Sequence, residues 1–124
     1  CTDLLEAIGE VAWVDDENLM DAVTAVSGSG PAYVFLLIEC LTQAGVEAGL
    51  SVALANQLAL STVAGAGELA RKVPESPADL RKQVTSPGGT TEAALEILME
   101  PRGLQTLMTR AVAAAAKRSR ELAG

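Results

Sequence analysis

Histidine is absent from this 124-residue sequence, and Trp, Tyr and Phe occur once each. Without histidine the chain lacks the side chain most often used as a general base or a transition-metal ligand near neutral pH. Cysteine is also scarce, since Cys1 and Cys40 are the two present and their spacing fits neither a metal-ligand motif nor a disulfide framework. We therefore expect no metal site, a reducing cytoplasmic setting, and a core built from Leu, Val, Ile and Ala.

Basic residues are few relative to acidic ones, with 9 Lys and Arg against 16 Asp and Glu and a formal net charge of −7 at pH 7. A nucleic-acid partner would need a basic stripe, so no such partner is expected. The acidic balance mainly favours solubility. The length fits one domain that can bury a substantial core.

Residues 48–67 contain no charged side chain, and about 20 apolar residues would span a bilayer. Asn56, Gln57, Ser61 and Thr62 in the middle of this stretch favour a buried helix instead, so no membrane partner is expected. A helix that is apolar on nearly every side needs neighbours on every side. A domain of this size can enclose few such helices, so we expect a second subunit to cover part of it.

Helix signals account for most of the chain, and the sequence predicts an all-α helical bundle. Ser51 and Ser76 are good N-caps, and Pro77 suits the first turn of the helix that Ser76 would begin. Residues 27–30 are expected to break one helix, and Pro31 suits the start of the next. The first predicted helix, capped by Asp16 or Asn18, runs through Ala25. The others are 31–48, 52–73, 77–85, 91–100 and 104–122, and a short helical piece at 3–8 and a short strand at 11–14 precede them all.

The most informative segment is residues 85–92, Thr-Ser-Pro-Gly-Gly-Thr-Thr-Glu, which precedes an apolar-periodic helix. Gly88 and Gly89 allow a tight turn, and a helix that begins at Thr90 or Thr91 would aim unpaired N–H groups at a ligand. Such a loop can hold a carboxylate or phosphate without Lys or Arg, because the start of a helix carries roughly half a positive charge. The simpler alternative is a glycine-containing turn capped by threonine.

Two blocks of the sequence resemble one known family. Residues 79–84 and 92–96 flank the loop, and with it they resemble the signature segment of pyrroline-5-carboxylate reductases. Residues 21–33 are similar to the stretch that enters the C-terminal helical domain of that family. The resemblance implies NAD(P)H-dependent reduction of 1-pyrroline-5-carboxylate to L-proline. It also implies an intertwined helical homodimer or a higher oligomer of dimers.

The family also has a dinucleotide-binding domain opened by a glycine fingerprint, which this sequence lacks. We therefore expect the chain to be the C-terminal part of a longer enzyme and inactive alone, with NADPH or NADH bound mainly by the absent domain. Residues 1–17 would be the end of that domain or a junction. Residues 18–124 would form the helical dimerisation and substrate-binding domain.

The resemblance implies two groups of site residues. The substrate carboxylate would be bound by the loop, where the catalytic Thr91 would also place its hydroxyl beside the ring nitrogen. These substrate-binding residues are Ser86, Gly88, Gly89, Thr90 and Thr91. The nicotinamide would lie against a second group, for which a plain helix break is the alternative explanation. These cofactor-binding residues are Thr24, Ser27, Gly28, Pro31 and Ala32.

No residue is an obvious proton donor, which suits an iminium that arrives already protonated. Glu75 and Glu92 are candidates, although exposed glutamates at helix ends are common. A non-catalytic dimerisation module is the main alternative function. A hydroxy-acid dehydrogenase domain is a weaker one, because it needs a base and only Lys82 lies near the loop in sequence.

Overall fold

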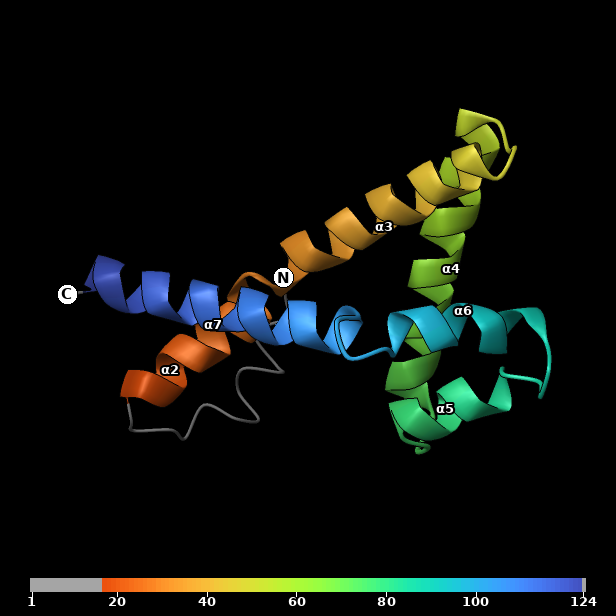
Figure 1. The fold of residues 1–124 in the computed structure, drawn as a ribbon. Coiled ribbons are helices and arrows are strands. Elements are labelled where there is room, and N and C mark those ends of the chain that lie inside the picture. The colour runs from red at the N-terminus through yellow and green to blue at the C-terminus, as the bar shows by residue number, and fades with distance from the viewer. Residues whose placement is uncertain (1–16, 124) are drawn as a thin grey trace. The chain divides into compact units, whose positions relative to one another are not determined.

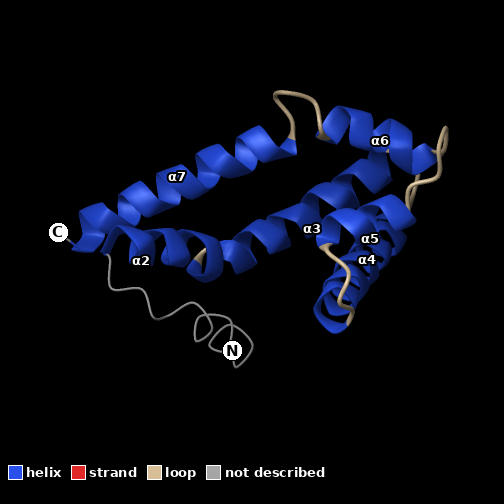
Figure 2. Ribbon diagram, turned by 90° about the horizontal axis from the view of Figure 1, so that it is seen from below, coloured by secondary structure: helices blue, strands red, loops and turns tan. Residues whose placement is uncertain are grey.

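A computed structural model describes residues 17–123, in which every regular element is a helix (Figures 1 and 2). The predicted all-α fold is confirmed. The pieces expected at 3–8 and 11–14 lie outside the described residues, as does most of the segment assigned to a domain junction. The elements are α2 (Glu17–Val23), the π-helix η1 (Thr24–Gly28), α3 (Gly30–Glu47), α4 (Val52–Lys72), α5 (Pro77–Gln83), α6 (Thr90–Leu98) and α7 (Leu104–Ala123).

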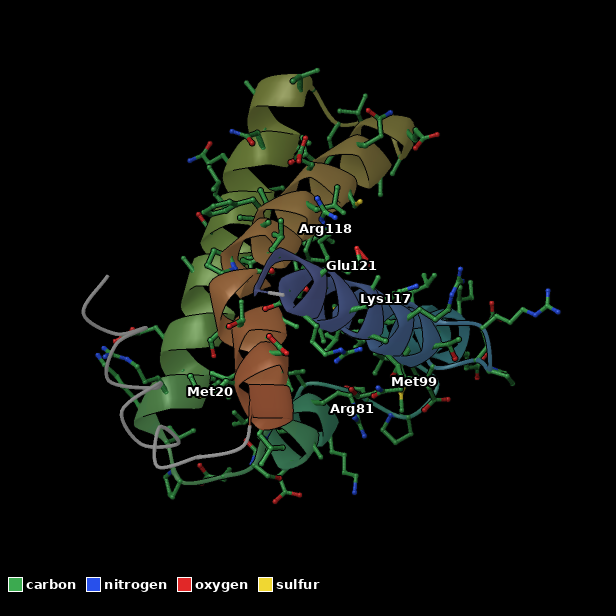
Figure 3. All side chains as sticks on the ribbon, turned by 90° about the vertical axis from the view of Figure 1, so that its left-hand side faces the viewer. Met20, Arg81, Met99, Lys117, Arg118 and Glu121 are labelled. Carbon is green, nitrogen blue, oxygen red and sulfur yellow. The ribbon has the colours of Figure 1, made fainter. Side chains whose placement is uncertain are left out.

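The helices divide between two compact units, one made of the described residues up to Ala32 and from Met99 onward, the other of Tyr33–Leu98. In the first unit α2 and η1 pack against α7. Ser119 Oγ on α7 donates a hydrogen bond to Asp21 Oδ1 on α2 at 2.7 Å. Ala25 is fully buried there. Arg118 and Glu121, labelled in Figure 3, form an exposed ion pair along α7 at 3.2 Å.

The break predicted at residues 27–30 is shorter than expected. After Val23 the chain continues as one π-helical turn, in which the Ser29 N–H donates to the Thr24 carbonyl at 3.0 Å. This wider turn carries the helix to Gly28, so that Ser29 alone separates it from α3. Pro31 lies in the first turn of α3, where its missing N–H costs no hydrogen bond.

A tight turn joins α3 to α4 in the second unit. Gly49 has a φ of 113°, its N–H donates to the Val46 carbonyl at 3.0 Å, and the Leu50 N–H donates to the Gly45 carbonyl at 3.0 Å. This pair of bonds is the Schellman motif, which satisfies the last carbonyls of a helix. Ser51 then caps α4, as predicted, by accepting a bond from the Leu54 N–H at 3.2 Å.

The two helices approach closely beside this turn because small residues face each other. A Cβ built on Gly45 would lie 3.2 Å from the Ala55 Cβ and 3.4 Å from Leu50 Cδ1. Ala55 and Ala59, on the same side of α4, are buried. The core of this unit is therefore narrow and made of alanine and glycine contacts.

The start of the short helix α5 was also predicted correctly, whereas the helix ends at Gln83, two residues before the predicted end. Ser76 accepts a bond from the Asp79 N–H at 3.1 Å, and Pro77 opens the helix.

At the end of α4, Glu68 lies 3.1 Å from Arg71 and 3.2 Å from Lys72. Hydrogen bonds from Arg71 and then Lys72 hold the pKa of Glu68 below its usual value. The three side chains are exposed, so these pairs add little to stability.

Large apolar side chains remain exposed on the two long helices. On α3, Phe35 is 63% exposed and Leu36 is 58% exposed, while Val52 at the start of α4 is 67% exposed. By length and composition Leu19–Glu47 is apolar enough to cross a membrane, and among the described residues no other helical stretch is. That test is weak evidence, because a core helix of a soluble protein also passes it. The exposed side chains of α3 and α4 nevertheless form apolar surface.

Candidate functional site

The loop between α5 and α6 reverses the chain, as Figure 1 shows, and contains a tight β-turn. The Gly89 N–H donates to the Ser86 carbonyl at 2.9 Å, and Gly88 has a φ of 72°. A type II turn has this pattern, with Pro at the second position and a glycine of positive φ at the third. Pro87 and Gly88 occupy those two positions. The Ser-Pro-Gly-Gly sequence thus determines the shape of this turn.

Gly89 is needed for a different reason, which is close packing. A Cβ at this position would lie 3.1 Å from the Ser86 carbonyl oxygen and 3.4 Å from the Ser86 Cβ. The contact with the Ser86 carbonyl oxygen is tighter than an ordinary van der Waals contact, so a side chain at Gly89 would force the backbone of the turn to shift. Gly88 has no atom within 4 Å of the corresponding position, and only its backbone conformation requires glycine.

The N-terminus of α6 presents hydrogen-bond donors beside this turn. The Gly89 carbonyl accepts the Ala93 N–H at 3.3 Å, so Gly89 is the residue just before the first helical turn. Within the described residues, the N–H groups of Thr90, Thr91 and Glu92 donate to no protein atom. These three N–H groups, with the partial positive charge of the helix end, can bind an anionic oxygen.

The side chains around these donors are polar and exposed. Ser86, Thr90 and Thr91 are exposed and carry hydroxyl groups that can add further hydrogen bonds. Gly89 is half-buried. The structure therefore brings the predicted substrate-binding residues into one loop and one helix start, all within the second compact unit.

The Gly89 N–H makes a different hydrogen bond from the one that the family resemblance implies. The family resemblance makes it a donor to a carboxylate, whereas in this structure it closes the turn on Ser86. The available backbone donors are shifted along the chain, to residues 90–92. A direct contact between Gly89 and a ligand stays a prediction.

The second predicted group lies on η1 and on the first turn of α3, in the other compact unit. The π-helical turn brings Gly28 close to Thr24, since a Cβ on Gly28 would lie 3.5 Å from the Thr24 Cγ2. Thr24, Gly28 and Ala32 are exposed, while Ser27 and Pro31 are half-buried. The group is uncharged throughout, so it suits a neutral ring better than a phosphate.

The two candidate proton donors occupy ordinary positions. Glu92 lies in the first turn of α6, where a carboxylate interacts favourably with the helix end, and Glu75 is exposed between α4 and α5. Among the described residues, no three His, Cys, Asp or Glu side chains lie together as a metal site would require.

Residues 17–122 match the family model for pyrroline-5-carboxylate reductase dimerisation. The chain belongs to this family. It is 51% identical over 120 residues to a pyrroline-5-carboxylate reductase from Pseudomonas aeruginosa, covering 97% of this chain and 44% of that protein. It is 53% identical over 119 residues to one from Synechocystis, covering 96% of this chain and 44% of that protein.

Solved structures agree with this family assignment. A pyrroline-5-carboxylate reductase from Coxiella burnetii superimposes with a TM-score of 0.82 at 42% identity, over 88% of this chain and 40% of that one. A pyrroline carboxylate reductase from Plasmodium falciparum, solved with NADP bound, gives a TM-score of 0.80 at 38% identity, over 88% of this chain and 41% of that one. The chain thus spans less than half the length of these reductases.

Proposed function

We propose that this chain is the C-terminal, dimer-forming part of a pyrroline-5-carboxylate reductase, which reduces 1-pyrroline-5-carboxylate to L-proline with NADPH or NADH in the cytoplasm. The observation that carries the proposal is the anion-binding geometry at the start of α6, found in a chain that belongs to this family. Two relatives that share about half of its residues bear the name of that enzyme.

The chemistry of the substrate explains what the loop has to do. 1-Pyrroline-5-carboxylate carries a carboxylate and a cyclic imine, and reduction needs a hydride at the imine carbon. Holding the carboxylate fixes one end of the ring and thereby orients the other end. The N–H groups of residues 90–92 and the Ser86 hydroxyl supply the donors for this contact. Thr91 places its hydroxyl beside the ring nitrogen.

The nicotinamide supplies the hydride when it is bound. The uncharged group on η1 and α3 fits its neutral ring: small side chains at Gly28 and Ala32 allow close approach, and Thr24 offers a hydroxyl. Nothing in this group is suited to the cofactor's phosphates. A separate dinucleotide-binding part of the enzyme would hold those.

The exposed apolar surface supports a homodimer or a higher oligomer of dimers. Soluble monomers rarely expose large contiguous apolar patches. Large apolar residues are exposed over residues 34–41 of α3 and residues 52–69 of α4. They are Val34, Phe35, Leu36, Leu37 and Leu41 on α3, and Val52, Leu54, Leu58, Leu60 and Leu69 on α4. A second copy of the chain would cover them.

Replacing Thr91 with valine in the full-length enzyme tests the site. Loss of a hydrogen bond to a charged group costs about 1.5–3 kcal/mol, so kcat/KM should fall roughly 10- to 150-fold. Because Gly89 and not Thr91 is the N-cap of α6, a Thr91 without a role in the site should change folding stability by about 0.5 kcal/mol or less and leave folded molecules fully active. Thr91→Ser, which keeps the hydroxyl, should recover most of the activity.

Steady-state kinetics with 1-pyrroline-5-carboxylate, measured beside urea unfolding midpoints, separate these outcomes. A Thr91→Val enzyme that is destabilised but fully active would reduce Thr91 to a structural residue. A full-length wild-type enzyme that fails to oxidise NADPH or NADH with this substrate would disprove the function itself.

A further inference from the structure

The hydroxyl of Thr85 makes the one side-chain hydrogen bond in the described loop at residues 84–89. Its Oγ1 donates to the Arg81 carbonyl in the last turn of α5, at 2.5 Å. Thr85 is half-buried, whereas the next three residues along the chain are exposed. Nothing in the proposed chemistry uses this side chain.

The hydroxyl completes the capping of α5. The Val84 N–H donates to the Leu80 carbonyl at 3.3 Å, and the Thr85 N–H donates to the Lys82 carbonyl at 3.1 Å. The Thr85 backbone has therefore moved from the normal helical partner, Arg81, to the next carbonyl along. Its side chain satisfies the Arg81 carbonyl that the backbone leaves unpaired.

The position of Thr85 gives this cap a consequence for the loop. Thr85 precedes Ser86, an exposed residue whose carbonyl closes the turn. At the other end of the turn, Gly89 leads directly into the donor groups of α6. Two hydrogen bonds from Thr85 thus attach the start of the loop to α5, and the closed turn transmits that fixed position to α6.

We propose that Thr85 is a positioning residue for substrate binding: its hydroxyl anchors the turn at residues 86–89 and thereby aligns the Ser86 hydroxyl with the N–H groups of α6. This inference rests on the proposed function. Without the anchor, the turn keeps its internal shape but loses its fixed orientation. Part of the free energy of substrate binding is then used to order the turn, which raises KM.

A matched control lies in the same compact unit. Thr42 Oγ1 donates to the Ile38 carbonyl at 2.8 Å, so it makes the same kind of bond four residues back along the chain, and it is half-buried like Thr85. Thr42 lies in α3, away from the loop in sequence. Thr42→Val removes a bond of the same geometry, but inside α3 the Ile38 carbonyl keeps its helical N–H partner, so it should cost less stability than Thr85→Val and leave substrate binding unchanged.

The experiment compares Thr85→Val, Thr85→Ser and Thr42→Val in the full-length enzyme. One hydrogen bond of this kind corresponds to about a 2- to 10-fold change in an equilibrium constant. We expect Thr85→Val to raise the KM for 1-pyrroline-5-carboxylate and the inhibition constant of L-proline by that factor. The KM for NADPH should not change, and Thr85→Ser should restore the wild-type values.

Equal kinetic constants for Thr85→Val and Thr42→Val would overturn the assignment and leave Thr85 as a helix cap. If Thr91→Val is impaired in the same series while Thr85→Val is not, the positioning role alone fails and the proposed function stands. If the wild-type enzyme neither reduces 1-pyrroline-5-carboxylate nor binds L-proline, both fail.

Discussion

Gly49 and Gly88 offer a direct test of whether the glycine loop binds the substrate. They are the glycines with positive φ in the described chain, at 113° and 72°, and a Cβ at either position would meet no atom within 4 Å. Replacing each with alanine therefore applies the same perturbation, backbone strain without a steric clash, at two places. Gly49 ends α3, whereas Gly88 shapes the turn before α6.

Both variants should lose stability. An L-residue in the left-handed region costs roughly 1–2 kcal/mol, and the φ of 113° at Gly49 lies beyond that region, so both urea midpoints should decrease, that of Gly49→Ala by at least as much as that of Gly88→Ala. The kinetic effects should differ. If the strained turn relaxes at Gly88→Ala, the donors at residues 90–92 move, and loss of even one charge-assisted hydrogen bond, at about 1.5–3 kcal/mol, raises KM roughly 10- to 150-fold.

Both variants would be assayed in the full-length enzyme at saturating NADPH, with 1-pyrroline-5-carboxylate varied. We expect a raised KM for Gly88→Ala and a KM close to wild type for Gly49→Ala. Equal KM values at equal losses of stability would refute the carboxylate site, because the turn would then be no more important to the substrate than a turn between two other helices.

Two further predictions concern the helices. Gly45→Leu should destabilise the protein by about 1–3 kcal/mol, since overpacking forces α3 away from Ala55, and an unchanged urea midpoint would show that this crossing tolerates a larger residue. The 124-residue chain alone should sediment as a dimer, because the exposed apolar side chains of α3 and α4 need cover, and it should not oxidise NADPH. A stable monomer, or turnover by this chain alone, would contradict that expectation.

Much of the fold could be predicted because its helix ends have local chemical signals. Ser51 and Ser76 cap the helices they were expected to cap, and Pro77 opens α5. The π-helical turn could not be predicted, since residues 24–28 have no composition that distinguishes it from an α-helical turn. It extended the helix through Gly28, where glycine and serine had suggested a break.

The candidate loop was recognisable for the same reason, because a Ser-Pro-Gly-Gly turn before a helix is a local pattern. The partner of each hydrogen-bond donor in the loop could not be predicted from the sequence. Whether the Gly89 N–H faces a ligand or closes the turn depends on the conformation of the loop, which residue types alone do not determine. Threonine often donates a hydrogen bond to the carbonyl four residues back, so the bond made by Thr85 could have been predicted from its residue type. That tendency carries no information about function.

The short connection between α3 and α4 has a consequence for how the protein assembles. Only residues 48–51 separate the two helices, so bringing them together costs little chain entropy, and the hairpin should form early from local contacts. At that stage its apolar faces have no cover. We expect refolding to pass through an aggregation-prone monomer with exposed apolar surface. The yield of native protein should fall as protein concentration rises, because non-specific association through the same surfaces competes with correct dimerisation.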